Sequence, residues 1–261
     1  MKCSLIITTY NRPEALILVL HSLLDQSILP DEVIIADDGS DSSTSNLIKE
    51  FNLQNEVNAI HSWQEDKGFR LSKSRNRAIA KAKSEYIIVI DGDMILHKDF
   101  IKDHKKFARK NTYIQGGRVL LQPEITEKIM KTKNFIKPSV FENDSKNKAN
   151  SFRIPLLTSV IASKINQNIK RIRGCNFSLF RDDIINVNGF NEEFKSWGKE
   201  DSEFVQRLFN NGIMRRDLKF SGIQYHLFHK EGSPESRNLE ILAKSINENL
   251  SWCMNGINKY L

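Results

Sequence analysis

The sequence lacks the glycine-rich motifs with which many α/β proteins bind nucleotide phosphates. No G-x-G-x-x-G follows its first apolar segment, and no G-x-x-x-x-G-K-[ST] occurs anywhere in its 261 residues. The first motif is typical of dinucleotide-binding dehydrogenases and the second of P-loop NTPases. Both classes are therefore disfavoured, and a bound nucleotide must be held by other residues.

Cysteines and long apolar runs are also scarce. Three cysteines, Cys3, Cys175 and Cys253, lie far apart, which fits neither a zinc site nor a disulfide framework and favours reduced, cytoplasmic thiols. No apolar run approaches the roughly 18 residues of a membrane-spanning helix. The first apolar segment, residues 3–7, is too short for a signal peptide. We therefore expect a cytoplasmic protein.

Basic residues outnumber acidic ones. The net charge is +7, which favours anionic partners such as nucleotide diphosphates or anionic lipid. Lysines and arginines crowd residues 98–137. A solvated helical face explains such a run, and the alternative is peripheral contact with an anionic membrane, at the inner face of the plasma membrane. No aromatic-rich basic motif accompanies the charge, so we expect no nucleic-acid partner.

The first third of the chain alternates between strand and helix patterns. Buried strands are predicted at residues 3–7, 33–36, 57–60 and 87–90, and helices at residues 16–24, 45–51 and 71–82. This alternation predicts an α/β fold with a parallel sheet and right-handed crossovers.

Beyond residue 93 the pattern loosens. Helices are predicted at residues 98–110, 182–187 and 200–209, and strands at residues 113–115, 173–180 and 223–230. Residues 122–170 are polar, and we expect them to be irregular or short-helical.

The central motif is Asp91-Gly92-Asp93, which directly follows the β-branched run of residues 87–90. In open α/β sheets ligands bind at the carboxyl ends of the strands. Gly92 allows a sharp turn close to a ligand, and two carboxylates suit a divalent cation that also holds a diphosphate. The alternative is a solvated Asp-Gly turn.

Polar residues follow the first two strands as well. Thr8, Tyr10 and Asp38 are candidates for holding a nucleotide, because an aromatic ring stacks on a base and a carboxylate accepts a hydrogen bond from a pyrimidine N3–H. The alternative for residues 37–40 is a turn that caps the next helix.

Two motifs in the second half suggest further site residues. Trp197 precedes Glu200 and Asp201, and a flat apolar ring beside a carboxylate suits a sugar and raises the basicity of the acid. Acids at a helix start also simply favour the helix dipole. His226 and His229 share a face of a strand only if the chain bends, and an imidazole near two carboxylates is a sensible third ligand for Mn²⁺. A structural or solvated role is the alternative.

Together these motifs resemble an inverting glycosyltransferase of family 2 with the GT-A fold. The resemblance covers about residues 3–232, leaving residues 118–170 and the last thirty unmatched, and is carried by residues 8–13, 37–40, 68–70, 74–78 and 91–93. Residues 189–192 and 197–201 are similar to the C-terminal region of β-1,4-galactosyltransferases and chondroitin-polymerase-type enzymes. One departure is Lys199, because the galactosyltransferase-like pattern has a second glycine there.

The resemblance implies a fold and a division of the chain. The fold would be a Rossmann-like, nucleotide-binding α/β/α sandwich with a mostly parallel central sheet. Residues 1–117 would form the donor-binding half, and residues 118–261 the acceptor-binding and catalytic-base half, in one continuous domain with a C-terminal helical tail.

The resemblance also implies roles for single residues. Asp201 would be the catalytic base and Glu200 would bind the acceptor. Asp93 and one of two histidines would hold Mn²⁺ or Mg²⁺, with His229 favoured over His226 and Asp91 holding the metal or the ribose. The nucleotide-sugar would be bound by Thr8, Tyr10, Arg12, Asp38, Arg75, Asn76, Asp91, Gly92 and Trp197.

The implied activity is the transfer of a sugar, with inversion, from a UDP-sugar to a hydroxyl of a glycan or glycolipid, in bacterial surface polysaccharide or lipopolysaccharide synthesis. One alternative is a sugar-1-phosphate nucleotidyltransferase, which has a glycine-rich signature that residues 8–13 lack. Another alternative is a non-catalytic sugar-binding module, in which at least one of the acidic residues of the site would be replaced. Asp38, Asp91, Asp93 and Asp201 are all present.

Overall fold

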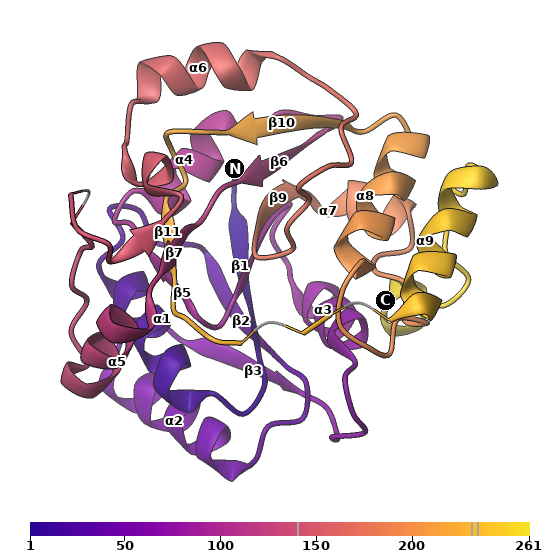
Figure 1. Cartoon of the computed structure of the whole chain (residues 1–261). Helices are drawn as coiled ribbons and strands as arrows, with labels where there is room; N and C mark the ends of the chain where they lie inside the picture. Colours follow the sequence, from indigo (N-terminus) through magenta and orange to yellow (C-terminus); the bar gives the residue numbers. More distant parts are fainter. Residues whose placement is uncertain (140, 231, 234) are drawn as a thin grey trace.

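A seven-stranded sheet forms the centre of the protein (Figure 1). The computed structural model describes residues 1–139, 141–230, 232–233 and 235–261. In spatial order the strands are β10 (Met214–Leu218), β6 (Thr112–Gly116), β9 (Asn176–Phe180), β4 (Tyr86–Asp91), β1 (Cys3–Thr9), β2 (Glu32–Asp37) and β3 (Ala59–Trp63). Neighbouring strands are parallel except at β9, which is antiparallel to both β4 and β6. The predicted α/β fold with a mostly parallel sheet is confirmed.

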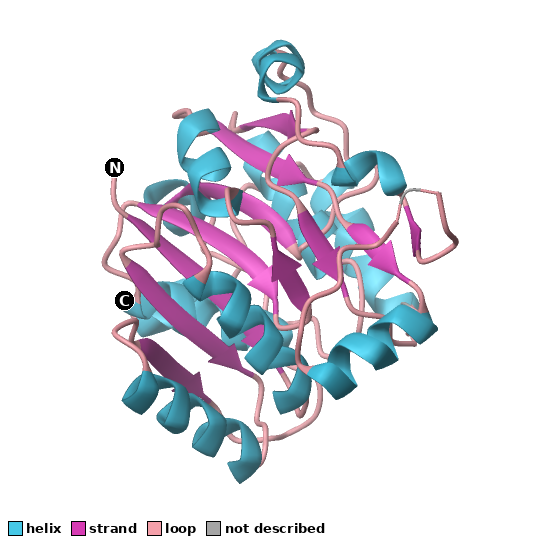
Figure 2. Cartoon of the chain, turned by 90° about the vertical axis from the view of Figure 1, so that its left-hand side faces the viewer, coloured by secondary structure: helices cyan, strands magenta, loops and turns pink. Residues whose placement is uncertain are grey.

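Helices cover both faces of this sheet (Figure 2). Because side chains alternate along a strand, Leu5 and Ile7 pack on one face and Ile6 on the other. The first face is covered by α1 (Pro13–Leu24), α2 (Ser42–Gln54) and α4 (Phe100–Phe107). The second is covered by α3 (Leu71–Lys81), α7 (Arg181–Asn186) and α8 (Glu200–Asn210). The result is the expected three-layer sandwich.

A second, four-stranded sheet lies beside the main one. Its order is β5 (Met94–Leu96), β11 (Gln224–His226), β7 (Val119–Leu121) and β8 (Ser145–Lys146). It packs against α1 and α5 (Pro123–Thr132). β5 and β11 are antiparallel, and His226 pairs with Met94, the residue after Asp93. This pairing brings the C-terminal half of the chain to Asp93.

Several predicted boundaries differ from the structure. The helix expected at residues 98–110 is α4, which is shorter at both ends, and the strand expected at residues 223–230 ends at His226. Residues 122–170 contain α5, a 3-10 helix η1 (Lys148–Ser151) and α6 (Pro155–Ser163), as the short-helical prediction has it. α6 lies at the periphery, over β10 (Figure 1).

The C-terminal part adds α9 (Ser236–Asn247) and a 3-10 helix η2 (Ile257–Tyr260). Among the helices that the structure describes, none is long and apolar enough to cross a bilayer.

Candidate active site

The carboxyl ends of β1, β2 and β4 meet at one edge of the main sheet. In the register of these strands Thr8 pairs with Asp91, and Thr9 pairs with Asp37. The Gly92 N–H donates to the Thr8 carbonyl at 2.6 Å, and a Cβ on Gly92 would lie 2.6 Å from that same oxygen. Only glycine therefore allows Asp91 and Asp93 to stand on either side of this turn.

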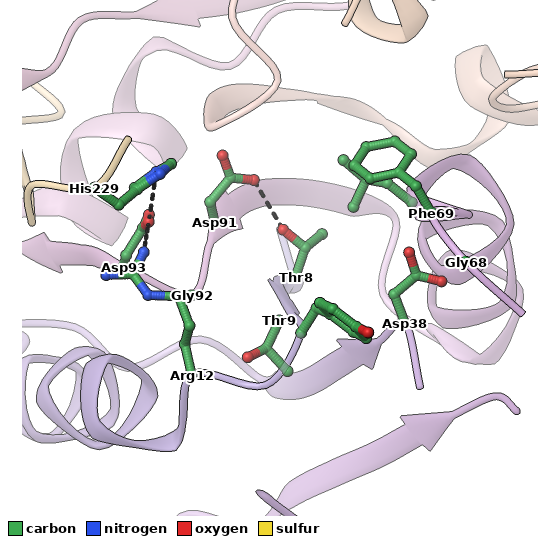
Figure 3. A pocket seen from close by; sticks show the side chains of 12 residues that line it. Thr8, Thr9, Arg12, Asp38, Gly68, Phe69, Asp91, Gly92, Asp93 and His229 are labelled. Atoms are coloured by element: carbon green, nitrogen blue, oxygen red, sulfur yellow. Dashed lines mark hydrogen bonds and ion pairs between the residues drawn. The ribbon is translucent and has the colours of Figure 1, made fainter. Parts of the chain in front are cut away.

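A cavity of about 330 Å³ opens at this edge and is called here the Asp38 cavity (Figure 3). It brings together most residues expected to bind the nucleotide-sugar. The predicted residues that line it are Thr8, Tyr10, Arg12, Asp38, Asp91, Gly92, Asp93 and His229. Thr9, Gly68, Phe69 and Leu71 also line it.

Asp38 is held firmly at one end of the cavity. Its carboxylate accepts hydrogen bonds from Gln64 Nε2 at 2.5 Å and from the Arg70 N–H at 2.7 Å. Burial raises the pKa of Asp38, although these two hydrogen bonds oppose the rise. Neighbouring Asp37 instead caps its own turn by accepting from the Gly39 and Ser40 N–H groups. The turn-capping alternative thus applies to Asp37 and not to Asp38.

A carboxylate and two imidazoles gather at the other end. Ligand atoms of Asp93, His226 and His229 all lie within 4.8 Å of one another. Asp93 Oδ2 lies 3.4 Å from His226 Nε2 and 3.2 Å from His229 Nε2. Both histidines reach it because β11 ends at His226, so the alternation of a strand no longer sets the direction of His229. The two alternatives for the metal histidine therefore lie at the same site.

The residues of this cluster fit a divalent cation. Asp93 Oδ1 is buried and has no hydrogen-bond partner among the residues that the structure describes, which is costly unless a ligand satisfies it. One carboxylate and two imidazoles form a donor set that binds first-row divalent metals.

Protonation of the cluster is set by its own contacts. Burial alone would raise the pKa of Asp93, but hydrogen bonds from His226 and His229 and the charge of Arg12 outweigh it and hold that pKa well below its usual range. The hydrogen bond to Asp93 raises the pKa of His229.

A second cavity, of about 380 Å³, is called here the Asp201 cavity and is lined by Asp201, Glu200, Trp197 and Arg75 among others. It shares Leu71, Asp91 and His229 with the Asp38 cavity. The two cavities therefore meet at Asp91 and His229, between the predicted nucleotide site and the predicted base.

Asp201 and Glu200 sit in different environments at the start of α8. Asp201 Oδ2 accepts from the Gly174 N–H at 2.9 Å, and Oδ1 accepts from the Ser202 N–H at 2.6 Å. Glu200 is buried, and its Oε1 lies 3.1 Å from Arg75 Nη1. Burial and the charge of Asp201 raise the pKa of Glu200 to about 7, against the effect of Arg75.

Arg75 connects the two cavities. Its guanidinium is buried, and Nη2 lies 3.4 Å from Asp91 Oδ1 while Nη1 pairs with Glu200. Asp91 also accepts a hydrogen bond from Thr8 Oγ1 at 2.8 Å. A Cβ on Gly174 would lie 2.7 Å from Arg75 Nη2, so the glycine leaves room for the guanidinium.

Lys199 takes the backbone conformation of the glycine that it replaces. Its φ of 77° lies in the left-handed region, which a side chain disfavours by roughly 1–2 kcal/mol. Its side chain lines the Asp201 cavity, as does that of half-exposed Trp197.

Asn76 is not brought to either cavity. It is fully buried, and its Nδ2 donates to the Phe190 carbonyl at 2.8 Å and to Glu192 Oε1 at 2.9 Å, while its Oδ1 accepts from the Phe190 N–H. Asn76 therefore anchors the loop before α8 and contacts neither cavity, contrary to the binding role expected for it.

Sequence reasoning missed the groups that orient the site acids. Gln64 and the Arg70 N–H hold Asp38, and the Gly174 N–H holds Asp201. Gln64 directly follows β3. Polar residues that follow β1, β2 and β4 are site candidates, and the same rule applied to β3 identifies Gln64. Gly174 precedes an antiparallel strand, and no comparable rule points to it.

A mostly parallel α/β sheet with acids at its carboxyl edge, joined there by histidines of the second sheet and acids of α8, is the architecture of a GT-A glycosyltransferase. The chain belongs to glycosyl transferase family 2, whose family model matches residues 4–184. A second family model, described as the N-terminal domain of galactosyltransferase, matches residues 155–230. The predicted family and the predicted enzyme class are confirmed.

Curated relatives are longer than this chain. Chondroitin synthase of Escherichia coli is 27% identical over 237 residues, which are 85% of this chain and 34% of the relative. Hyaluronan synthase of Pasteurella multocida is 28% identical over 227 residues, which are 80% of this chain and 23% of the relative. The chain thus spans 34% and 23% of the length of these two proteins.

Solved structures of S. aureus TarS share the fold. The complex of TarS 1–349 with UDP-GlcNAc has a TM-score of 0.63 and 18% identity, covering 100% of this chain and 75% of that one. At this identity the likeness concerns the fold alone. Nucleotidyltransferase and non-catalytic alternatives are set aside by the family assignment.

Proposed function

We propose that this enzyme is a metal-dependent, inverting glycosyltransferase that moves a sugar from a UDP-sugar to a hydroxyl of a glycan or glycolipid, in synthesis of a bacterial surface polysaccharide or lipopolysaccharide. The observation that carries the proposal is the meeting of the Asp38 and Asp201 cavities at Asp91 and His229. A nucleotide in the first cavity would place its sugar at the entrance to the second.

The Asp38 cavity supplies the groups that a uridine diphosphate needs. Asp38 offers carboxylate oxygens to a pyrimidine N3–H, and the half-exposed ring of Tyr10 offers a stacking surface at the rim. Arg12 lies at the opposite end, beside Asp93. A relative in the same fold class was solved with UDP-GlcNAc, which supports a UDP-sugar donor.

Asp93, His226 and His229 would hold the metal, with Asp93 Oδ1, which no described residue pairs with, as the first ligand atom. Two imidazoles favour Mn²⁺ over Mg²⁺, because Mg²⁺ prefers oxygen ligands. When bound, the cation supplies positive charge that stabilises the leaving diphosphate.

Asp201 is the proposed base. It removes the proton of the acceptor hydroxyl while the hydroxyl oxygen bonds to the anomeric carbon and the bond from that carbon to the diphosphate breaks. One displacement inverts the anomeric centre. The Gly174 N–H and Ser202 N–H fix the carboxylate of Asp201. Glu200, paired with Arg75, would contact the acceptor.

The proposed division into a donor half at residues 1–117 and an acceptor half at residues 118–261 needs one addition. Except for His229, the Asp38 cavity is lined by residues 8–93. His226 and His229 come from the second half and complete the cluster around Asp93. Metal binding would thus depend on both halves.

A donor screen tests the proposal. UDP release would be measured for UDP-glucose, UDP-galactose and their N-acetyl forms, with Mn²⁺ and with EDTA. We expect release from at least one donor only with the metal. NMR of the glycosidic product should show the anomeric configuration opposite to that of the donor. Equal release in EDTA, or a retained configuration, would contradict the proposal.

A further inference from the structure

A third cavity, called here the basic cavity, has no role in the reaction described above. It measures about 920 Å³ and lies beside the Asp201 cavity, with Arg173 lining both. Its floor includes Gln115 and Leu218, at the carboxyl ends of the parallel strands β6 and β10. It therefore opens at the same edge of the sheet as the proposed active site.

The charge of this cavity is strongly one-sided. Its charged lining residues are Lys170, Arg171, Arg173, Arg215, Lys219 and one acid, Asp217. Asp217 is already paired with Arg215 at 2.6 Å. Lys170, Arg171 and Lys219 are exposed, and the acidic residues that the structure describes form no ion pair with them. Positive charges gathered in a concave site attract anions.

The wall that carries these cations is a built structure. The buried Arg215 donates from Nη1 to the Asn168 and Lys170 carbonyls, both at 2.8 Å. Gln115 accepts from the Arg173 N–H at 3.2 Å and donates to the Arg173 carbonyl at 3.1 Å. Residues 168–173 are thus fixed to the sheet at two points, so the cations do not depend on a loose loop.

The same segment reaches the proposed base. Gly174, which follows Arg173, donates its N–H to Asp201 Oδ2. A molecule with a hydroxyl at Asp201 would extend past Arg173 into the basic cavity. Amide side chains of Asn147, Asn150 and Asn168 also line the cavity, and amides hydrogen-bond sugar hydroxyls.

We infer that the basic cavity is the acceptor subsite and that the acceptor is an anionic glycan or polyol chain, whose carboxylates or phosphates are bound by Lys170, Arg171 and Lys219. This inference rests on the proposed function. Carboxylates and phosphates are both anionic groups that lysine and arginine bind, and the test below distinguishes between them. A neutral oligosaccharide would leave the positive charges of the cavity without a counter-charge.

The test compares binding of three probes to the full chain with UDP and Mn²⁺ present, by calorimetry. The probes are a hyaluronan tetrasaccharide with two carboxylates, a glycerol phosphate tetramer, and the neutral cellotetraose. The variant is K170Q/R171Q/K219Q. Its matched control is K49Q/K128Q/K244Q, which removes the same charge from exposed positions on α2, α5 and α9.

We expect one anionic probe to bind at least tenfold more tightly than cellotetraose and to weaken as salt is raised. The triple variant should lose about tenfold in affinity for that probe, since exposed ion pairs contribute modestly, and the control should lose little. Equal binding of cellotetraose, no binding of either anion, or an equal loss in the control would overturn the inference.

UDP binding separates this inference from the proposed function. The basic-cavity residues lie outside the Asp38 cavity, so metal-dependent UDP affinity should be the same in all three proteins. If UDP binds normally and no anionic probe binds, only the acceptor inference fails. If UDP fails to bind the wild type, the proposed function itself fails.

Discussion

Arg12 Nη1 lies 2.7 Å from Asp93 Oδ2, so the carboxylate at the centre of the candidate metal site is already paired with a cation. A divalent ion entering the cluster therefore meets a like charge beside its first ligand. Diphosphate oxygens would offer Arg12 another partner, so the nucleotide and the metal should help each other to bind.

Replacing Arg12 tests this relationship. R12Q should bind Mn²⁺ several-fold more tightly than wild type without UDP, because like-charge repulsion is removed. The same variant should bind UDP more weakly with Mn²⁺ present. Manganese EPR and calorimetry measure the two affinities, and R109Q, an exposed arginine near α4, is the control. Unchanged Mn²⁺ affinity in R12Q would show that the pair does not restrain the site.

Asp93 should make UDP binding depend on the metal. Calorimetry should show wild-type affinity for UDP falling strongly on addition of EDTA, whereas D93A binds weakly with or without chelation. H226A and H229A should each lose part of the metal dependence, and the larger loss identifies the stronger ligand. D182N, an exposed acid at the start of α7, is the control. Metal-dependent binding that survives in D93A would place the cation elsewhere.

Asp201 has two possible roles at the start of α8, which one substitution separates. A helix-stabilising acid contributes roughly 0.5–2 kcal/mol to stability, whereas a general base contributes about 10²–10⁴ in rate. D201N keeps one of the two oxygens that accept from the Gly174 N–H and the Ser202 N–H, and it cannot take a proton. We expect it to lose no more than the roughly 0.5–2 kcal/mol of the helix-stabilising role, to bind UDP with Mn²⁺, and to transfer sugar at least about a hundredfold more slowly. Near-normal transfer would move the base to Glu200.

Glu200 should make stability depend on pH. Its pKa is raised from 4.5 to about 7, so between these values the folded state keeps a proton that the unfolded state releases. The free energy of unfolding therefore falls as pH rises through this window, by up to about 3 kcal/mol. E200Q lacks this titration. Urea unfolding should therefore show that the free energy of unfolding of E200Q, relative to that of wild type, is higher at pH 8 than at pH 5. E193Q, an exposed neighbour, should show no such gain. A pH-independent difference between E200Q and wild type would contradict the shift.

The basic run from Lys98 to Lys137 should bind anionic membranes. In the structure it is spread over α4, α5 and their flanks, and Lys102, Lys106 and Lys128 are exposed. Sedimentation with phosphatidylserine vesicles should fall steeply as salt is raised, because surface charges are screened. Binding that survives about 1 M salt would instead implicate exposed apolar residues of α6, where Leu156 is 85% exposed and Val160 60%.

The sequence alone predicts the parts of the fold that rest on local pattern. The apolar runs that form β1, β2 and β4 are long enough to identify, and the acids that follow them mark the edge of the sheet. β10 was missed because it contains Arg215 and Arg216, whose guanidinium groups donate to backbone carbonyls instead of reaching solvent.

Site geometry depends on contacts that no local pattern reveals. The approach of His226 to Asp93 follows from the pairing of β5 with β11, and strands of three residues leave almost no periodic signal. The resemblance of residues 74–78 implied a ligand-binding role for Asn76. It points instead to Phe190 and Glu192, more than a hundred residues away along the chain.

The reversed direction of β9 has a consequence for how such enzymes diversify. Because β9 is antiparallel to its neighbours, the chain passes the reaction centre on its way into this strand, through residues 168–174. Residues 168–174 lie outside the strands, and the pairing of β1 with β2 and β4 does not involve them. If these residues contact the acceptor as proposed, a change of this loop would alter acceptor choice and leave the lining of the Asp38 cavity unchanged.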